Sequence, residues 1–558
     1  MPIITEITLI VALAAFLSII AHWLKQPTII GYIAAGLLIG PLGFIELNNL
    51  EVVNSLAKIG IALLLFLVGL EINIKEIRSV GKAAVYTGLG QVIFTFLIGF
   101  GLAKILGFSL VVAAYIAIAL TFSSTIIIIK LLSDKRELDT LYARIVVGLL
   151  LIQDLIAILA LIILPGIVGD SQGNEGGVNW INLGMILIKG GALFGATLFI
   201  GKKVLPKLFD FISNSQETLF VASLAWGLGV AAIVASPLIG FSIEIGGFLA
   251  GLALASSGYH YQISARIKPL RDFFIILFFV ILGSQMTIGG TTELIKPAII
   301  LSLFVLIGNP LIMLFIMGAL GYRAHTSFKA SITVAQISEF SLILAFLGLE
   351  LGHLEESHVA LITIVGLITI VVSSYLITHG DALYKILRKG LKIFEIRGKL
   401  IEKTGIVRGL KNHIVIIGAD RMGSMIVETL KEKKANFVVI DFNPSVWERL
   451  KSERVPSIYG DANDEEIQEQ AKLENARVII STVPTLEDNL AILEYMKKNN
   501  PQSKVIMTAE NSMRAKELYE EGADYVVIPQ QMSGKYLAEL VNDNGNITNL
   551  MKLRNHEK

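Results

Sequence analysis

The sequence predicts a membrane all-α domain of about thirteen transmembrane helices, built as inverted repeats, followed by a cytoplasmic α/β domain of Rossmann type. Three observations support this fold class. Of the 558 residues, 54% are hydrophobic and only 17% are charged. The charges are uneven, because residues 1–380 are mostly apolar whereas 381–558 have the composition of a soluble protein. Finally, the apolar stretches are about 20 residues long, the length at which a helix crosses the hydrocarbon core.

The composition also argues against several classes of function. A formal net charge of +1 gives no indication of nucleic-acid binding. The chain has no cysteine, and therefore neither a disulfide framework nor a cysteine metal site. It lacks the Gly-x-x-x-x-Gly-Lys-Ser/Thr sequence that an ATP-driven pump needs. The first apolar stretch lacks a basic n-region and a small-residue cleavage site, so we interpret it as a transmembrane helix.

Charges in the loops predict the orientation of the spans. Loops that follow odd-numbered windows are basic, whereas loops that follow even-numbered windows are acidic or neutral. The positive-inside rule then places the N-terminus outside and the C-terminal domain in the cytoplasm. We expect a multi-pass protein of the cell (inner) membrane. The thirteen windows are 3–24, 28–45, 53–72, 83–106, 109–131, 144–166, 182–201, 218–235, 238–256, 272–288, 296–320, 328–348 and 357–379.

A repeat lies within these spans. Residues 31–40 (GYIAAGLLIG) resemble 246–255 (GGFLAGLALA), and 65–69 (LFLVG) resemble 279–283 (FVILG). The offset of about 215 residues also aligns span five with span twelve. Seven spans separate the copies, an odd number, so the halves have opposite orientations. Inverted repeats are typical of secondary transporters, with the substrate site near the midplane between the repeats.

Spans five and twelve carry polar residues at corresponding positions. Broken helices would explain them, because the ends of half-helices offer partial charges and free backbone groups to an ion. The alternative is that the hydroxyls bond back to their own helices. The symmetry of the two segments favours broken helices. The polar residues are Thr121, Ser123, Ser124 and Thr125 in span five, and Gln336, Ser338 and Glu339 in span twelve.

Asp154 lies near the middle of the window 144–166. A carboxylate at this depth costs about 3 kcal/mol on insertion scales, and it usually faces an ion path or a protein-lined cavity. The alternative is a carboxylate that pairs with a neighbouring helix for packing. We predict that Asp154 is the transport site and binds K⁺ or Na⁺, since one carboxylate and a few hydroxyls suit either ion.

A single carboxylate also predicts the stoichiometry. Burial disfavours its charged form, so a proton and a cation compete for one group. Span ten contains no Lys or Arg after Arg271, and hence no basic partner that carries a second charge. We therefore expect electroneutral exchange. Glu339 is the competing site, and we expect it to stabilise a half-helix instead.

The segment after the last span predicts a helix on the membrane surface. Residues 383–394 (LYKILRKGLKIF) alternate apolar and basic residues at helical spacing. Such a basic amphipathic helix fits an anionic leaflet, and a solvated connector helix is the alternative. Six short apolar runs then begin at His413, separated by polar helical segments, and this pattern predicts a six-stranded parallel sheet.

The first turn of this sheet departs from the usual dinucleotide fingerprint. Asp420 stands where the middle glycine normally lets the backbone approach a pyrophosphate. Arg421 beside it suits a single phosphate at a helix N-terminus, and Asp441 ends the second strand, where an acidic side chain reaches ribose hydroxyls. AMP and NAD(H) therefore stay open as regulatory ligands, as does a docking module without a nucleotide.

These motifs together resemble a known family. Residues 31–41, 69–71, 120–125, Gln153-Asp154 and 336–340 are similar to the Kef-type branch of the monovalent cation:proton antiporters (the cation:proton antiporter-2 family), with a C-terminal RCK or TrkA-N domain. The resemblance implies a homodimer in which a dimerisation scaffold flanks a moving core with two crossed broken helices. It favours K⁺ and makes Gln153 a candidate cation ligand. The implied nucleotide-binding residues are Gly418, Asp420, Arg421, Met422, Gly423, Asp441, Asp461, Ala462 and Thr482.

The sequence thus predicts an antiporter in the lipid bilayer, a secondary transporter rather than an enzyme, regulated by an adenine nucleotide. The alternatives are a nucleotide-gated K⁺ channel, although no Thr-Val-Gly-Tyr-Gly filter is present, a Na⁺/H⁺ antiporter, and a membrane-anchored redox enzyme without a visible catalytic constellation. The predicted domains are 1–380 (exchanger), 381–411 (basic amphipathic linker), 412–534 (nucleotide-binding) and 535–558 (tail).

Overall fold

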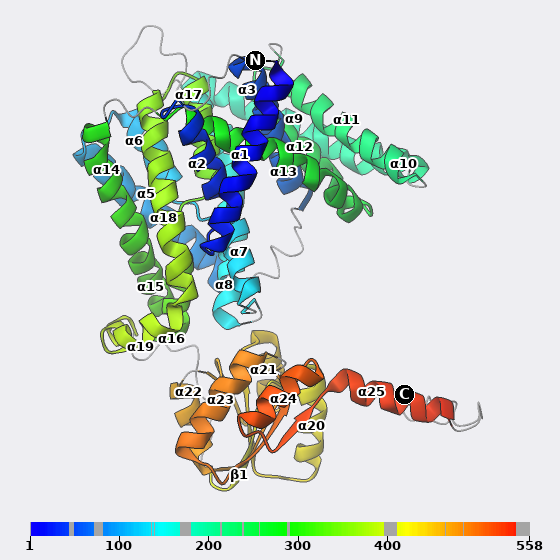
Figure 1. Cartoon of the computed structure of the whole chain (residues 1–558). Coiled ribbons are helices and arrows are strands. Elements are labelled where there is room, and N and C mark those ends of the chain that lie inside the picture. Colours follow the sequence, from blue (N-terminus) through cyan, green and yellow to red (C-terminus); the bar gives the residue numbers. More distant parts are fainter. Residues whose placement is uncertain are drawn as a thin grey trace. The chain divides into compact units, whose positions relative to one another are not determined.

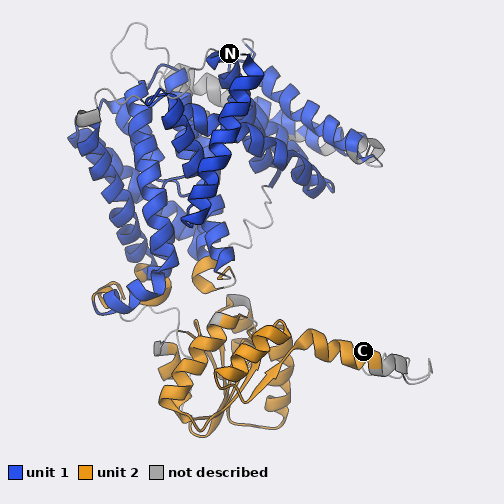
Figure 2. Cartoon of the chain, in the orientation of Figure 1, with its two compact units in different colours: residues 1–135, 145–317, 327–389 blue, residues 136–144, 318–326, 390–558 orange. Residues whose placement is uncertain are grey.

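The computed structural model describes residues 2–542 except 44–48, 72–81, 136, 139, 168–179, 213–214, 237–238, 256, 287–290, 396–409, 464 and 484. The chain divides into two compact units (Figure 2). Unit one comprises residues 1–135, 145–317 and 327–389, and unit two comprises 136–144, 318–326 and 390–558. Residues 396–409 of the predicted linker (381–411) and 543–558 of the predicted tail (535–558) lie outside the described residues.

Unit one is helical, and each of the thirteen predicted windows coincides with described helices (Figure 1). Seven of the helices that the structure describes are long and apolar enough to cross a membrane. The helices are α1 (Ile3–Trp23), α2 (Thr28–Ile39), α3 (Leu50–Glu71), α5 (Lys82–Ile105), α6 (Leu110–Ala119), α7 (Thr125–Asp134), α8 (Leu141–Ile167), α9 (Trp180–Lys203), α10 (Leu205–Ile212), α11 (Gln216–Val234), α12 (Ile243–Leu254), α13 (His260–Ser284), α14 (Thr291–Leu303), a π-helical turn (Phe304–Gly308), α15 (Asn309–Leu320), α16 (Ala324–Thr333), α17 (Glu339–Glu350), α18 (Glu356–Thr378) and α19 (Gly380–Leu391).

The largest difference from a predicted boundary has a clear physical reason. Helix α13 begins at His260, not at the predicted residue 272, because the charged first half of the helix lowers the hydropathy of any window that includes it. Backbone hydrogen bonds continue through this half regardless of side-chain polarity. A hydropathy window therefore locates the apolar half of α13 and misses the rest.

The repeat motifs pack against each other. Helix α2 packs on α13, and α3 packs on α12. A Cβ atom added to Gly36 would collide with the carbonyl oxygen of Val280, and one added to Gly251 would collide with the carbonyl oxygen of Phe66. Small residues allow such close backbone approach between membrane helices. The glycines that revealed the repeat in the sequence thus form the contact between its two copies.

The membrane helices form two groups by their packing. In the first, α3 packs against α12 and α13, α2 against α1, and α11 against α12. In the second, α6 packs against α5 and α17, and α18 against α14 and α17. We call these groups the scaffold bundle and the core bundle. Both broken helices contribute to the core bundle.

Unit two contains the predicted parallel sheet. Its strands are β1 (His413–Ile417), β2 (Phe437–Asp441), β3 (Ser457–Tyr459), β4 (Ala476–Ser481), β5 (Lys504–Thr508) and β6 (Tyr525–Val527), in the order β3-β2-β1-β4-β5-β6. All pairs are parallel, with Val415 opposite Val438 and Ile479. The order reverses at β1, which is the dinucleotide-binding topology. Intervening helices include α20 (Arg421–Glu432), α21 (Pro444–Ser452), α22 (Glu465–Gln470), α23 (Leu486–Asn499) and α24 (Ser512–Glu520), and α25 (Pro529–Asn542) follows β6.

Candidate functional site

Spans five and twelve break at the predicted polar segments. Helix α6 ends at Ala119 and α7 begins at Thr125, while α16 ends at Thr333 and α17 begins at Glu339. Serine caps both second halves, as expected for helix N-termini. Ser124 accepts a hydrogen bond from the amide of Ile127 at 3.3 Å, and Ser338 accepts one from the amide of Phe340 at 3.2 Å.

The two breakpoints touch each other. The hydroxyl of Ser123 in span five donates to the carbonyl oxygen of Val334 in span twelve at 3.2 Å. Both residues are fully buried, so this bond is shielded from solvent. The ends of four half-helices therefore meet in one small volume, and their unpaired backbone groups must be satisfied there.

Asp154 points at the start of a half-helix. Its Oδ2 accepts a hydrogen bond of 2.9 Å from the hydroxyl of Thr125, the first residue of α7. A helix N-terminus carries a partial positive charge, which favours a carboxylate. Glu339, the first residue of α17, lies close enough for the two carboxylate charges to repel each other. The structure therefore brings the predicted site and its competitor together. Asp154 is half-buried and Glu339 is buried.

The side-chain amide of Gln153 forms two hydrogen bonds to the backbone of the first breakpoint, one through its oxygen and one through its nitrogen. Its Oε1 accepts from the amide nitrogen of Ser123 at 3.1 Å, and its Nε2 donates to the carbonyl oxygen of Thr121 at 3.1 Å. The Thr121 hydroxyl bonds back to the carbonyl of Ile118 at 2.7 Å, so the back-bonding alternative holds for this residue. In this conformation the Gln153 side chain supports the broken backbone.

Residues that sequence reasoning missed satisfy the carbonyl end of α6. Ser341 of α17 donates to the carbonyl of Ala119 at 2.6 Å, and the Asn309 side chain donates to that of Leu120 at 3.2 Å. Asn309 also accepts from the hydroxyl of Thr95 at 3.0 Å. It directly follows a π-helical turn, a feature frequent at functional sites. The sequence signal that could have identified Asn309 is the pair Asn309-Pro310 inside an apolar span.

The second breakpoint has different supports. The Oε1 of Gln336 accepts from the Ser373 hydroxyl at 2.7 Å, and the hydroxyl of Thr369 accepts from the amide of Ile337 at 3.4 Å. Among the residues that the structure describes, no partner is found for the buried Nε2 of Gln336. The hydroxyl of Ser338 also donates to Glu339 at 3.3 Å. Helix α18, which carries Thr369 and Ser373, thus holds span twelve as α8 holds span five.

A cavity of about 300 Å³ lies beside the first breakpoint, between α5, α6 and α8. Thr121 lines it, and the other walls are apolar, including Phe96 and Leu159. Asp154 is not among its lining residues. An apolar wall offers no ligands to a cation, so this cavity is no ion site.

In unit two, the predicted nucleotide residues gather at the carboxyl ends of the first strands. Gly418 has a φ of +83° and accepts a hydrogen bond from the Thr482 hydroxyl at 3.0 Å. A Cβ atom on Gly423 would collide with the carbonyl oxygen of Gly418. These two glycines therefore serve the tight turn and the close helix packing of the fingerprint. Asp420 and Arg421 are exposed and Met422 is half-buried at the N-terminal end of α20.

Asp441 holds this turn in place. Its Oδ2 accepts from the amide of Ala419, and its Oδ1 accepts from the amide of Asn443, both at 2.7 Å. Burial raises the pKa of the Asp441 carboxyl, and these two backbone hydrogen bonds oppose the shift. The side chain predicted to contact ribose therefore also fixes the Gly418 turn.

A second acidic group lies at the same edge of the sheet. Asp461 and the buried Ala462 follow β3. The side-chain Nδ2 of Asn463 donates a hydrogen bond to Oδ1 of Asp488 at 2.5 Å. Burial, together with the neighbouring Asp461 charge, raises the pKa of Asp488. The structure thus brings together the predicted residues at the ends of β1, β2, β3 and β4.

Two protein-family models match the chain. A model described as "Sodium/hydrogen exchanger, transmembrane" matches residues 9–379, and one described as "TrkA-N domain" matches residues 414–529. The putative cation/proton antiporter YbaL of Escherichia coli (strain K12) is 28% identical over 550 residues, with 97% of each chain covered.

Two solved structures match different parts of the chain. The sodium proton antiporter MjNhaP1 from Methanocaldococcus jannaschii is 18% identical, with 70% of this chain and 97% of that chain covered and a TM-score of 0.52. This likeness shows a shared fold of the membrane part. The TrkA-N domain of the Escherichia coli inner membrane protein YbaL is 28% identical, with 24% of this chain and 98% of that chain covered and a TM-score of 0.23.

Proposed function

We propose a specific exchange cycle for this chain, on the premise that it belongs to the sodium/hydrogen exchanger family. The chain is a cation/proton antiporter with a TrkA-N domain, and the relatives it matches are transporters rather than enzymes. In the proposed cycle, Asp154 alternately holds a proton and a monovalent cation. K⁺ is the first candidate for that cation and Na⁺ the second. The observation that supports this assignment is the contact of Asp154 with Thr125 at the crossing of two broken helices.

The proton and the cation exclude each other at Asp154. A deprotonated carboxylate offers a charge and free lone pairs to a cation, while a protonated one offers neither. The N-terminal end of α7 stabilises the deprotonated form. Nearby carbonyl and hydroxyl oxygens at the breakpoints complete a set of oxygen ligands, and Gln153 keeps the breakpoint in shape through its two backbone hydrogen bonds.

The proposed exchange is electroneutral. Apolar residues follow Asp272 through most of α13, and the stretch 272–284 contains no Lys or Arg that would release a second charge during the cycle. Glu339 serves the N-terminus of α17 and stays outside the cycle. One proton then moves against one cation, and the membrane potential does not drive the net reaction.

Alternating access follows from relative movement of the two bundles. Lys58 of α3, in the scaffold bundle, forms an ion pair with Glu350 of α17, in the core bundle, at 2.6 Å. Such a contact must break if the core bundle slides along the scaffold. In the proposed arrangement the scaffold bundle also forms the homodimer interface, which crosslinking in native membranes tests directly.

Reconstitution tests the proposed cycle. Purified protein is placed in vesicles with an imposed pH gradient. Added K⁺ should make this gradient collapse, and the rate of collapse should saturate with the K⁺ concentration. Na⁺ in place of K⁺ ranks the two ions. Clamping the membrane potential with an ionophore should leave the rate unchanged if the exchange is electroneutral. A current at single-channel rates would instead support a nucleotide-gated channel.

The TrkA-N domain is proposed to regulate the exchanger by binding an adenine nucleotide. Its strand order and the Gly418 turn support a nucleotide at the carboxyl edge of the sheet. The exposed Asp420 side chain disfavours a pyrophosphate in the usual position, so AMP ranks level with NAD(H). Regulation requires that the nucleotide bind the active and inactive states with different affinity.

Calorimetry with AMP, ATP, NAD⁺ and NADH ranks these ligands. Asp441→Ala should weaken the bound nucleotide by about 1–3 kcal/mol, the cost of unmatched polar partners. The transport rate should change while the preference for K⁺ over Na⁺ stays the same. Binding of none of the four would leave the domain as a docking module.

The proposed topology places the N-terminus outside and the TrkA-N domain in the cytoplasm of a cell with an inner membrane. The chain has no cysteine, so single introduced cysteines report sidedness without background. A cysteine in place of the exposed Met513 should react with a membrane-impermeant thiol reagent only from the cytoplasmic side.

A further inference from the structure

Helix α19 presents an exposed surface directly after the last membrane span. It begins at Gly380, two residues after α18 ends at Thr378. Ile386 is 78% exposed and Leu387 is 45% exposed. Lys385 and Lys389, also exposed, lie one helical turn apart along one side of these apolar residues. We call these four residues the α19 surface.

The chemistry of the α19 surface fits a bilayer with anionic headgroups. A helix that starts within one turn of a span end lies at headgroup depth, where the apolar side chains leave water. Basic residues beside the apolar stripe then meet the negative charge of the lipids.

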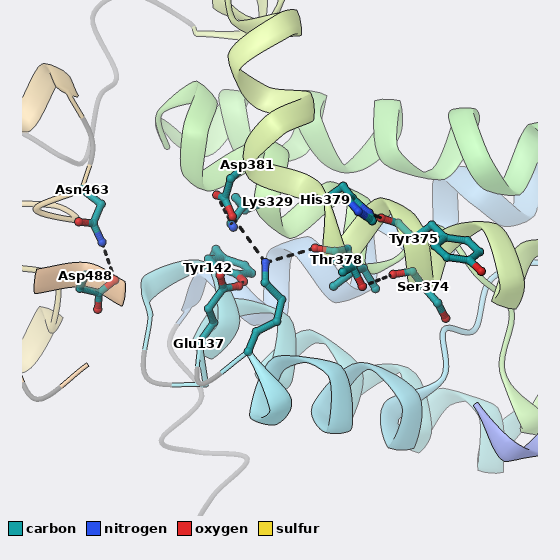
Figure 3. Close-up of polar contacts among 12 residues, drawn as sticks. Glu137, Tyr142, Lys329, Ser374, Tyr375, Thr378, His379, Asp381, Asn463 and Asp488 are labelled. Carbon is teal, nitrogen blue, oxygen red and sulfur yellow. Dashed lines mark hydrogen bonds and ion pairs between the residues drawn. The ribbon is translucent and has the colours of Figure 1, made fainter. Parts of the chain in front are cut away.

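The first turn of α19 is joined to both broken helices. The carboxylate of Asp381 forms an ion pair with Lys329 of α16 at 2.6 Å, and the Lys329 side chain is only 5% exposed. Figure 3 shows these two side chains together, near the end of the helix that carries Ser374 and Thr378. Asp381 also pairs with Lys135, which caps α7, at 3.6 Å.

The same Lys135 reaches a third helix. Its ammonium donates to the carbonyl of Ile377, in the last turn of α18, at 3.3 Å. A cation at a helix C-terminus is favourable, because the last carbonyls carry partial negative charge. Asp381 and Lys135 thus tie together the ends of α7, α16 and α18, all of which belong to the core bundle.

We propose that the α19 surface binds anionic phospholipid headgroups and that, through Asp381, this binding keeps the ends of α7, α16 and α18 together. The part that concerns transport rests on the proposed function, whereas the binding part does not. A core bundle that moves as one body needs its half-helices held together at their ends. Anionic lipid therefore raises the exchange rate.

Lipid contact is tested by fluorescence on the full chain, which has no cysteine of its own. Leu387→Cys, labelled with an environment-sensitive fluorophore, should be quenched by spin-labelled lipid more strongly in vesicles containing phosphatidylglycerol than in phosphatidylcholine alone. Met513→Cys in the TrkA-N domain is the control and should show no quenching. Absence of quenching at position 387, or equal quenching in both lipids, would overturn the proposed binding surface.

Charge removal tests the role of the two lysines. The double variant Lys385→Gln/Lys389→Gln should lose on the order of twentyfold in its preference for phosphatidylglycerol, since each basic residue near an anionic surface contributes about fivefold. Lys498→Gln/Lys516→Gln removes the same charge from exposed positions of the TrkA-N domain and should leave the preference unchanged. An unchanged preference in the first variant would contradict the proposal.

Asp381→Asn tests the coupling. Wild-type protein should exchange ions several times faster in vesicles with phosphatidylglycerol than without, and the variant should show one rate in both while quenching at position 387 persists. A variant that keeps the lipid dependence would refute the role of Asp381. Quenching does not require transport, so failure of the exchange cycle and failure of the lipid surface remain distinguishable.

Discussion

The two broken helices share an interrupted backbone, but different side chains hydrogen-bond to it. In span five, the amide of Gln153 bonds to both sides of the break, and the neighbouring Asp154 bonds to the start of α7. In span twelve, the hydroxyl of Thr369 accepts a single amide hydrogen bond. The repeat offset of 215 residues places Thr369 opposite Asp154. Only one copy of the repeat therefore has a carboxylate at this position of its supporting helix.

This difference separates structure from chemistry within the repeat. Both copies need a broken helix whose ends are capped and hydrogen-bonded, because unpaired backbone groups are costly in a dry interior. In the proposed cycle only one copy needs an ionisable group, because one exchange site suffices for the proposed one-for-one antiport. The repeat symmetry thus explains why both helices are broken. The departure from symmetry at Asp154 explains why only one copy holds the proposed ion-binding carboxylate.

The largest effect is expected at the asymmetric position. Asp154→Asn should abolish cation-dependent proton flux in proteoliposomes, at least a hundredfold, because an amide neither releases a proton nor offers a charge. The thermal stability of the protein should change little, since the amide retains an acceptor for Thr125. Glu339→Gln is the matched control and should retain exchange. Exchange by the Asp154 variant at the wild-type rate would move the site to Glu339.

A smaller effect is expected for Gln153→Leu. The change leaves the buried amide of Ser123 and carbonyl of Thr121 without partners, at about 1–3 kcal/mol each. We expect a lower melting temperature and roughly a tenfold lower maximal rate. The relative rates for K⁺ and Na⁺ should stay the same, because Gln153 acts through the backbone. A changed selectivity would make Gln153 a cation ligand, as the family resemblance suggested.

Asn309→Leu should act in the same direction but less strongly. It removes the donor to Leu120 and the acceptor for Thr95 while keeping the same branched side-chain shape. The expected result is a maximal rate several times lower, with an unchanged cation concentration at half-maximal rate. Asn309→Asp should not restore the wild-type rate, since the Asp side chain lacks the donor to the Leu120 carbonyl. Equal activity of the Leu variant would assign Asn309 to packing alone.

The smallest effect is expected for Thr369→Val, the counterpart in the second repeat. The shape is nearly conserved. The 3.4 Å bond from the amide of Ile337 is lost, together with the 3.2 Å bond that the hydroxyl donates to the carbonyl of Gly366 in its own helix, so the cost is about 1 kcal/mol. Transport should remain within about twofold of wild type. A loss of transport rate as large as that of Gln153→Leu would mean that the two breakpoints are equally important for transport. It would contradict the proposed difference between the two repeats.

Much of the fold was predictable because it depends on patterns along the chain. Apolar length predicted the membrane helices, and short apolar runs with a Gly turn predicted the parallel sheet around β1. The polar segments at Thr121 and Gln336 predicted both breaks, because a membrane helix tolerates such residues only where something else satisfies them. The same reasoning made Asp154 the proposed transport site.

The supports of the site were not predictable in this way. Asn309, Ser341 and Thr369 are ordinary polar residues within apolar windows, and their neighbours in space are far away in the sequence. Asp381 is likewise one acid in a basic segment until α7 and α16 are placed beside it. Each of these roles depends on which helix ends meet.

The sequence by itself determined the span pattern, the inverted repeat, the intramembrane carboxylate and the sheet, because each follows from local periodicity and from the cost of polar groups in lipid. The tertiary structure alone decided which side chain satisfies each free carbonyl and amide at the crossing. That choice depends on distances of about 3 Å between groups separated by as many as 222 residues, such as Ser341 and Ala119. No local property of the chain encodes such a distance, so only the packed helices bring these groups within hydrogen-bonding reach.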